Sequence, residues 1–351
     1  MHGLQLNIFG GALEPFERPT PAPAGTELLL RVVATGICHT DLHLSDGYYD
    51  LGGGKRLSVA ARGLEPPIIF GHEVVGEIVA CGPDADPALV GRTMLVYPWT
   101  GCGDCPLCAR GEYNACPTPA FIGIHRPGGY ADHVIVPHGR YLIEIGDLTP
   151  VEAAPYACSG LTAYGALNKI GMERLRQEPC LLIGAGGLGL MALSILVGIG
   201  SPRVVIVETN AARRAEALRS GASAAVDGAD PDATRLIVEA LGGAPNAIVD
   251  FVGASATVDL ALPLLARGGK YVVVGLFGGE TTVALPLLAM RAISIEGSNV
   301  GTLAELQDLM ELARAGRLPR ITVTRHGLSE GNEVLNALRA GQIVGRAVLQ
   351  P

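Results

Sequence analysis

Residues 180–189 read C-L-L-I-G-A-G-G-L-G, a short apolar run followed at once by a glycine-rich turn. The apolar run predicts a buried strand at 180–183, and the apolar residues that continue to Ile199 predict a helix. The glycines match the pattern G-x-G-x-x-G, which indicates a dinucleotide site only where a strand precedes it and a helix follows it. Both conditions are met here, so a plain glycine-rich turn is the weaker interpretation.

Each part of this turn has its own expected role. Gly184 permits the tight turn, Gly186 lets the backbone approach a pyrophosphate, and Gly189 lets the helix pack closely on the strand. Gly187 and Leu188 open the helix, where unpaired N–H groups attract an anion. The turn therefore predicts a binding site for a dinucleotide.

Strands and helices alternate along the chain after this turn. Apolar strands are expected at 203–207, 247–251 and 271–274, with a helix over 211–220. Strands that are buried on both faces read as nearly unbroken apolar runs, because crossover helices cover a parallel sheet on both sides. We expect an α/β domain with a doubly wound parallel sheet over residues 155–293.

The sequence on either side of this region has a different pattern of apolar and polar residues. Short β segments at 27–34, 73–80 and 132–136 predict a compact, barrel-like β domain over residues 1–154. Helices are expected over 302–314 and 330–339, before a last strand at 346–349 that returns to the first domain. Residues 294–351 would then complete the β domain, and the functional site would lie between the two domains.

Composition excludes several classes of function. The net charge is −8 and no cluster of Lys or Arg is present, which argues against a nucleic-acid surface. No apolar stretch is long enough to span a bilayer. Residues 1–10 lack the features of a secretory signal, so we expect a cytoplasmic protein. In a reducing compartment, the 8 cysteines favour metal binding or catalysis over disulfides.

Four cysteines crowd one loop with the spacing C-x2-C-x2-C-x7-C: Cys102, Cys105, Cys108 and Cys116. Four thiolates form a closed tetrahedral zinc site, which leaves no position for water or substrate. We therefore expect a structural zinc ion that staples the loop. An iron–sulfur cluster is the alternative, but this spacing suits a single ion better. Cys81 and Cys180 have no such neighbours and are expected to be small buried apolar residues.

Three further potential ligands lie far apart in the sequence. Cys38 follows a predicted strand, His72 opens another, and Cys158 stands near the start of the second domain. Each by itself is more often a core residue than a ligand. Brought together, two cysteines and a histidine would supply a zinc site with an open position, as catalysis requires.

The chain resembles the zinc-containing medium-chain alcohol dehydrogenases, and is especially similar to the tetrameric archaeal and bacterial members that act on hydrophobic alcohols. The resemblance runs nearly end to end, and its further motifs are G-I-C-H-T-D-L-H at 36–43, G-H-E-V-V-G at 71–76, P-W-T-G at 98–101, V-G-L-F-G at 274–278 and G-R-A-V-L at 345–349. It implies a GroES-like β-barrel catalytic domain, a Rossmann nucleotide-binding domain, a catalytic and a structural Zn2+ in each subunit, NAD, and a homotetramer.

The resemblance also implies the roles of residues around the catalytic zinc. Cys38, His72 and Cys158 would be its ligands, and Glu73 would be a fourth ligand when water or substrate is absent. Asp41 would orient His72 and fix its tautomer. Zinc would then lower the pKa of the bound alcohol, so that a hydride can pass to the nicotinamide.

The proton of the alcohol needs a path to solvent. By the resemblance, Thr40 hydrogen-bonds the reacting oxygen, and the proton passes through the cofactor ribose to His43. Taken alone, Thr40 could cap a turn and His43 could be an ordinary surface histidine. The spacing of the family motif favours the relay.

Glu208 ends the apolar run V-V-I-V-E, about 20 residues after the glycines, where an acid accepts hydrogen bonds from the adenosine ribose. Because that acid repels a 2′-phosphate, we predict NAD over NADP. Arg213 and Arg214 lie just beyond and could in principle favour a phosphate, although the resemblance places Arg213 on the ribose. Further cofactor contacts implied by the resemblance are His39, at a position where some relatives carry an arginine, Thr162, Leu276 and Arg346.

Trp99 and Phe121 fall where related enzymes line the substrate pocket, although either could be an ordinary core residue. As pocket residues they imply an apolar site for hydrophobic primary or secondary alcohols and the corresponding aldehydes or ketones. The glycine-rich segment 48–67 predicts a surface excursion near the cleft or a subunit contact.

Three other functions compete with alcohol oxidation. The same site would serve a carbonyl reductase, and the sequence does not separate the two directions. A catalytically silent zinc protein that senses NAD(H) is disfavoured by the complete ligand set. A zinc-free quinone reductase of the same fold is excluded, because such proteins lack these cysteines.

Overall fold

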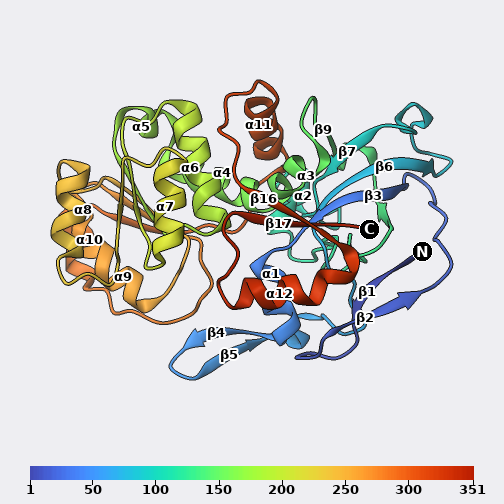
Figure 1. The fold of residues 1–351 in the computed structure, drawn as a ribbon, viewed down its shortest axis with the longest axis horizontal. Coiled ribbons are helices and arrows are strands. Elements are labelled where there is room, and N and C mark those ends of the chain that lie inside the picture. Colours follow the sequence, from blue (N-terminus) through green and yellow to red (C-terminus); the bar gives the residue numbers. More distant parts are fainter.

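Two sheets organise the chain in the computed structural model, which describes residues 1–351. A six-stranded sheet lies on one side of the molecule and a seven-stranded sheet on the other, with both chain termini on the side of the second (Figure 1). The sequence predicted this division into an α/β part and a β part.

The six-stranded sheet is parallel throughout, in the order β12-β11-β10-β13-β14-β15. Its strands are β10 (Cys180–Ile183), β11 (Val204–Val207), β12 (Ala224–Val226), β13 (Ala247–Asp250), β14 (Lys270–Val273) and β15 (Ser294–Gly297). All residues of β10, β11 and β13 are buried, which explains why these strands read as unbroken apolar runs.

Helices cover both faces of this sheet. They are α4 (Ser159–Ile170), α5 (Met172–Gln177), α6 (Gly187–Ile199), α7 (Ala211–Arg219), α8 (Ala233–Leu241), α9 (Ser255–Ala261) and α10 (Leu285–Arg291). Alternate residues of β10 enter two different apolar clusters: Leu182 packs with α4 and α6, whereas Leu181 packs with α8. The sheet is therefore doubly wound, as predicted.

The seven-stranded sheet has the order β16-β17-β3-β6-β7-β9, with β8 paired to β3. Its strands are β3 (Leu28–Gly36), β6 (Glu73–Cys81), β7 (Thr93–Val96), β8 (His133–Val136), β9 (Leu142–Glu144), β16 (Val323–Gly327) and β17 (Arg346–Gln350). Strand β17 pairs with β3 through Val348 and Gly36. The end of the chain thus returns to the first domain, as predicted.

Shorter elements complete this part of the molecule. The helices are α1 (His39–Asp46), α2 (Pro106–Ala109), α3 (Pro150–Ala153), α11 (Leu303–Arg314) and α12 (Gly331–Arg339). Two hairpins lie outside the main sheet: β1 (His2–Leu6) with β2 (Leu13–Glu17), and β4 (Tyr48–Gly52) with β5 (Lys55–Ser58). None of the helices of the protein combines the length and the apolar character that a bilayer crossing requires.

The parallel sheet extends beyond the predicted end of the nucleotide-binding domain. We expected the nucleotide-binding domain to end at residue 293, but β15 pairs with β14 as the last strand of the parallel sheet. Ser294 and Ile295 in β15 are exposed, so this edge strand has no buried apolar run to mark it in the sequence. The parallel sheet therefore extends to Gly297.

One apolar cluster runs through both parts. It joins Val74 in β6 and Trp99 of the first domain with Leu161 in α4 and Leu190 in α6. Because interiors are close-packed, this shared core holds the start of α4 firmly against β3 and β6. The candidate site lies at this junction.

Candidate active site

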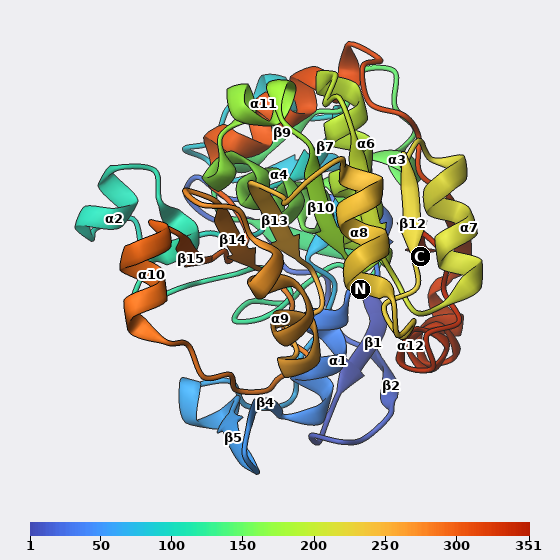
Figure 2. The ribbon, with the colours of Figure 1, turned by 90° about the vertical axis from the view of Figure 1, so that its left-hand side faces the viewer.

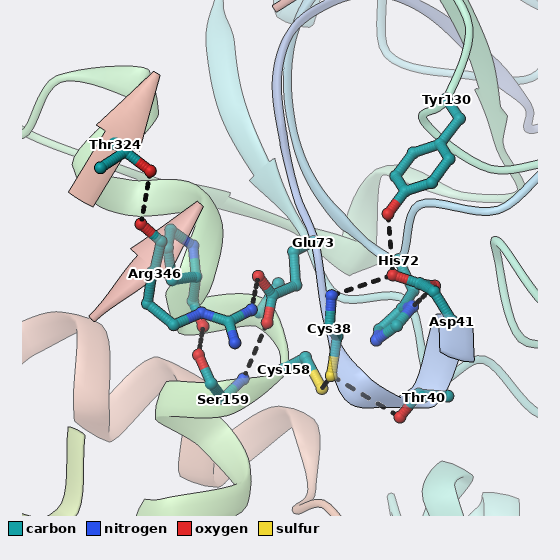
Figure 3. Close-up of polar contacts among 12 residues, drawn as sticks. Cys38, Thr40, Asp41, His72, Glu73, Tyr130, Cys158, Ser159, Thr324 and Arg346 are labelled. Atoms are coloured by element: carbon teal, nitrogen blue, oxygen red, sulfur yellow. Dashed lines mark hydrogen bonds and ion pairs between the residues drawn. The ribbon is translucent and has the colours of Figure 1, made fainter. Parts of the chain in front are cut away.

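Three side chains from separate elements meet at the junction of the two domains (Figure 3). Cys38 precedes α1, His72 precedes β6, and Cys158 precedes α4. Their ligand atoms all lie within 4.8 Å of one another, and the two sulfurs are 3.8 Å apart. Two sulfurs at about 2.3 Å from a tetrahedral zinc stand about 3.8 Å apart. The geometry therefore fits a zinc ion.

His72 has one nitrogen left for a metal. Its Nδ1 faces Oδ1 of Asp41 at 3.2 Å, and its buried Nε2 has no hydrogen-bond partner in the protein. An unpartnered buried nitrogen is unfavourable, and a metal ion would satisfy it. Burial lowers the pKa of His72, but Asp41 and Cys38 outweigh it and raise that pKa well above its ordinary value.

Asp41 is itself held in place by two hydrogen bonds. Its Oδ2 accepts one from the Cys38 N–H and one from the Tyr130 hydroxyl, each 2.9 Å long. Asp41 thus lies beside His72, as the family resemblance implied, and its role in fixing the tautomer stays a prediction. Tyr130 was not predicted, because a tyrosine in a loop before β8 carries no pattern that points to a metal site.

Glu73 faces away from the three ligands (Figure 3). Its Oε2 accepts a 2.6 Å hydrogen bond from Arg346, and its Oε1 accepts one of 3.1 Å from the Ser159 N–H. Burial raises the pKa of Glu73 to about 7, although Arg346 opposes that shift. In this arrangement Glu73 is not part of the ligand group, so its role as a fourth ligand stays a prediction.

The two predicted relay residues lie on one side of α1. The Oγ1 of Thr40 is 3.6 Å from the Cys38 sulfur, and His43 stands three residues later, so both share a face of the helix. Burial lowers the pKa of His43. Thr40 therefore adjoins the zinc ligands, and the onward path to His43 stays a prediction.

The glycine turn has the geometry that its sequence predicted. Gly184 has a φ of +92°, and a Cβ on Gly189 would stand 1.9 Å from the Gly184 carbonyl oxygen. A Cβ on Gly186 would meet no atom within 4 Å, so the backbone there faces open space. Six predicted cofactor residues line one cleft at this point: His39, Gly186, Gly187, Leu188, Arg213 and Arg346. The start of α6 in this cleft offers the N–H groups that attract an anion such as a dinucleotide pyrophosphate.

Glu208 lies directly after β11 and beside the glycine turn. Its carboxylate accepts hydrogen bonds of 2.9 Å from the N–H groups of Ala185 and Asn210. Arg214 donates to the Glu208 carbonyl oxygen and pairs with Asp227 at 3.0 Å. Arg213 donates to the Gly341 carbonyl oxygen at 3.0 Å. The charge of Arg214 is therefore already balanced by Asp227. Glu208 is the first acidic residue that follows the glycine turn in the sequence.

Five predicted cofactor residues lie outside the lining of that cleft: Gly184, Gly189 and Glu208, described above, and Thr162 and Leu276. Thr162 is buried in α4, where its N–H bonds the Cys158 carbonyl, and Leu276 follows β14 with 52% of its surface exposed. Their contacts with the cofactor stay predictions.

Aromatic rings continue outward from the zinc ligands. The Trp99 ring lies 5.4 Å from His72 and 5.3 Å from Phe121, between ring centres. The Trp99 indole N–H donates to the Ala157 carbonyl at 3.0 Å, which fixes its orientation. Trp99 therefore lies beside His72, and Phe121 lies beside Trp99; their contact with a substrate stays a prediction.

The four-cysteine loop forms a second group of sulfurs. The four ligand atoms lie within 4.8 Å of one another, and the Sγ atoms of Cys102 and Cys116 are 3.5 Å apart. Backbone N–H groups of the same loop donate to these sulfurs, from Cys108 to Cys105 at 3.4 Å and from Cys102 to Cys116 at 3.3 Å. Such bonds stabilise thiolates, so the loop fits a closed zinc site.

Comparison with known proteins agrees with both sites. Residues 24–147 match the alcohol dehydrogenase GroES-like domain, and residues 187–315 match the zinc-binding dehydrogenase domain. NAD-dependent alcohol dehydrogenases of Saccharolobus solfataricus and Sulfurisphaera tokodaii are 35% and 33% identical to this chain, with 100% of each chain covered. The crystal structure of the alcohol dehydrogenase from Aeropyrum pernix superposes with a TM-score of 0.89, at 31% identity and full coverage of both chains.

These relatives share the whole length of the chain, and its two domains carry the zinc ligands and the glycine turn in the predicted places. The protein is therefore an oxidoreductase whose two cysteine-containing sites fit a catalytic and a structural zinc. The chain belongs to the zinc-containing medium-chain alcohol dehydrogenase family.

Proposed function

We propose that this protein transfers a hydride reversibly between NAD and a hydrophobic primary or secondary alcohol, with the aldehyde or ketone as the other partner. The observation that carries the proposal is the buried triangle of Cys38, His72 and Cys158, whose imidazole has a free Nε2. Arg346, which binds the adjacent Glu73, also lines the cleft at the glycine turn, so the metal site and the dinucleotide cleft adjoin.

Each residue around the site has its own role in the proposed reaction. When bound, zinc lowers the pKa of the alcohol and NAD accepts the hydride. Asp41 orients His72, and the Thr40 hydroxyl accepts a hydrogen bond from the alcohol and positions its proton for transfer. His43 exchanges the proton with solvent, and burial lowers its pKa, which favours the neutral imidazole that can accept a proton. Trp99 provides an apolar wall that excludes water.

The preference for NAD follows from Glu208. A carboxylate at the end of the second strand accepts hydrogen bonds from ribose hydroxyls and repels a 2′-phosphate. Arg214 does not offset this charge, because Asp227 already pairs with it. A higher kcat/KM with NADP than with NAD would contradict this assignment.

The preference for hydrophobic alcohols follows from the rings beside His72. Trp99 and Phe121 offer no free polar group to a substrate tail, since the indole N–H is bonded to Ala157. We expect medium-length, cyclic or aromatic alcohols to be better substrates than ethanol. Replacing Trp99 by Ala should change the preference between bulky and small alcohols.

NADH formation with a panel of primary, secondary, cyclic and aromatic alcohols tests the proposal. The purified, zinc-loaded protein should reduce NAD with several of these alcohols and should oxidise NADH with the matching carbonyl compounds. A protein that binds NADH but turns over none of them would instead be the silent sensor considered above.

We also propose that the protein is a cytoplasmic homotetramer. Exposed apolar side chains beside the edge strand β15, among them Leu285, Met290 and Ile295, support self-association. All eight cysteines are free, and thiolate zinc sites suit a reducing compartment. Light scattering on the protein as it elutes from a sizing column tests the homotetramer. Cell fractionation tests the cytoplasmic location.

A further inference from the structure

The β4–β5 hairpin of the catalytic domain lies below α1 and α12 in Figure 1 and beside the chain that leads to α10 in Figure 2. A Cβ on Gly52 would stand 2.7 Å from the Gly279 carbonyl carbon, and one on Gly278 would stand 2.5 Å from the Asp50 carbonyl oxygen. Lys55 also faces Glu280 at 3.8 Å. The two backbones thus touch without intervening side chains.

The turn that receives the hairpin is anchored in its own domain. The Ser255 hydroxyl donates to the Glu280 carbonyl at 2.8 Å and accepts from the Glu280 N–H at 3.0 Å. Gly278 forms a bridge with Ala254, just before α9. The hairpin tip therefore rests on a fixed surface of the nucleotide-binding domain.

The other end of the hairpin lies against the proposed proton relay. Helix α1 ends at Asp46, and Gly47 reverses the chain with a φ of +78°. This reversal brings the Tyr49 ring to 5.0 Å from the His43 ring, with 34° between their planes. Tyr49 thus packs on the imidazole that the relay uses.

Tyr49 makes the one aromatic contact of that imidazole. His43 has no side-chain hydrogen bond, and its acidic neighbour Asp46 is bound by both terminal nitrogens of Arg339, at 2.9 and 2.7 Å. An imidazole without a hydrogen-bond partner takes its orientation from packing. Tyr49 supplies the aromatic contact.

We infer that Tyr49 is a positioning residue for His43, and that the contact of the hairpin tip with the 278–280 turn keeps Tyr49 in place. The relay is then complete only while the two domains stay in contact through the hairpin. This inference rests on the proposed role of His43 in alcohol oxidation.

A matched pair of glycines in the hairpin tests the docking step. Gly52 and Gly54 both have left-handed backbones, with φ of +83° and +77°, but only Gly52 touches the other domain, because a Cβ on Gly54 would meet nothing. Gly52→Ala and Gly54→Ala therefore cost similar backbone strain, and only the first also pushes the hairpin away from the 278–280 turn.

The readout is the rate at which diethyl pyrocarbonate modifies His43 in the zinc-loaded, NAD-free protein, measured by peptide mass spectrometry. Gly52→Ala and Tyr49→Ala should raise this rate by about 2- to 10-fold, because the loss of one aromatic contact shifts the equilibrium between the packed and the exposed imidazole by about that factor. Gly54→Ala and Tyr49→Phe should match the wild type. Equal rates for the two glycine variants, or an unchanged rate in Tyr49→Ala, would overturn the inference.

Turnover separates this inference from the proposed function. Tyr49→Ala should lower kcat more than it raises the KM for NAD, and added imidazole buffer should restore part of kcat by accepting the proton in place of His43. A loss of kcat that buffer does not restore would show a merely structural role for Tyr49. A wild-type protein without alcohol activity would refute the proposed function, while the modification rates would still report on the packing of His43.

Discussion

The two cysteine-containing sites are built in opposite ways. Cys102 and Cys116 in the four-cysteine loop are 14 positions apart, whereas Cys38 and Cys158 in the catalytic site are 120 positions apart. The loop makes its own N–H donors for the sulfurs, whereas His72 depends on Asp41 from another element. A local site needs only its loop, and a distributed site needs the whole fold.

The sites also differ in exposure and in what surrounds them. Cys102 is exposed, and the loop holds four sulfurs that close the coordination of a metal. The catalytic ligands are all buried and number three, which leaves a fourth position. We therefore expect damage to the loop to reduce stability and damage to the triangle to reduce activity.

The largest effect should come from Cys38→Ser. Loss of a catalytic ligand should lower kcat/KM by about 1000-fold or more, because several kcal/mol of Lewis-acid stabilisation disappear. Elemental analysis should show the zinc content falling by about one ion per chain. Cys81→Ser, at a cysteine outside both sites, is the control. Activity that survives in Cys38→Ser would show that Cys38 is not a ligand of a catalytic metal and would contradict the contrast between the two sites.

Cys105→Ser should give the converse result. Serine can still cap α2, as the Cys105 sulfur does for the Cys108 N–H, so the change removes mainly the metal ligand. We expect the Tm to fall by about 5–10 °C with kcat of the folded enzyme nearly unchanged. Calorimetry and assays well below the Tm measure the two quantities. A large fall in kcat without loss of stability would refute a structural role.

Asp41→Asn should have an intermediate effect on activity. The amide cannot orient His72 with a negative charge, and such changes behind a metal ligand typically cost about 10- to 100-fold in metal affinity or activity. Zinc titration against a competing chelator and kcat/KM measure this. The four-cysteine loop should keep its zinc in the same sample, which serves as an internal control.

Among the changes around the catalytic site, Tyr130→Phe should have the smallest effect on activity. It removes one hydrogen bond to Asp41 and leaves the bond from the Cys38 N–H. The free energy of unfolding should fall by about 1.5–3 kcal/mol, because the acceptor is a buried carboxylate. Chemical denaturation measures this, and the change in kcat/KM should be smaller than in Asp41→Asn. A larger loss of activity than in Asp41→Asn would show that Tyr130 acts on more than Asp41.

The sequence by itself predicted the features whose physics is local. The run at 180–183 followed by Gly184 and Gly189 requires a tight strand-to-helix turn, and the structure shows the predicted backbone there. The cysteine spacing at 102–116 likewise predicts one closed metal site, since short segments bring the sulfurs together.

Only the tertiary structure decided which distant side chains face one another. Nothing in the sequence around Tyr130 relates it to Asp41, and nothing around Glu73 shows that it binds Arg346. The exposed edge strand β15 and the contact between Gly52 and Gly279 also escaped prediction. The periodicity of apolar residues shows which face of a single helix or strand is buried. The contacts named here depend instead on how separate elements pack, and that packing is set by the complementary shapes of the whole core.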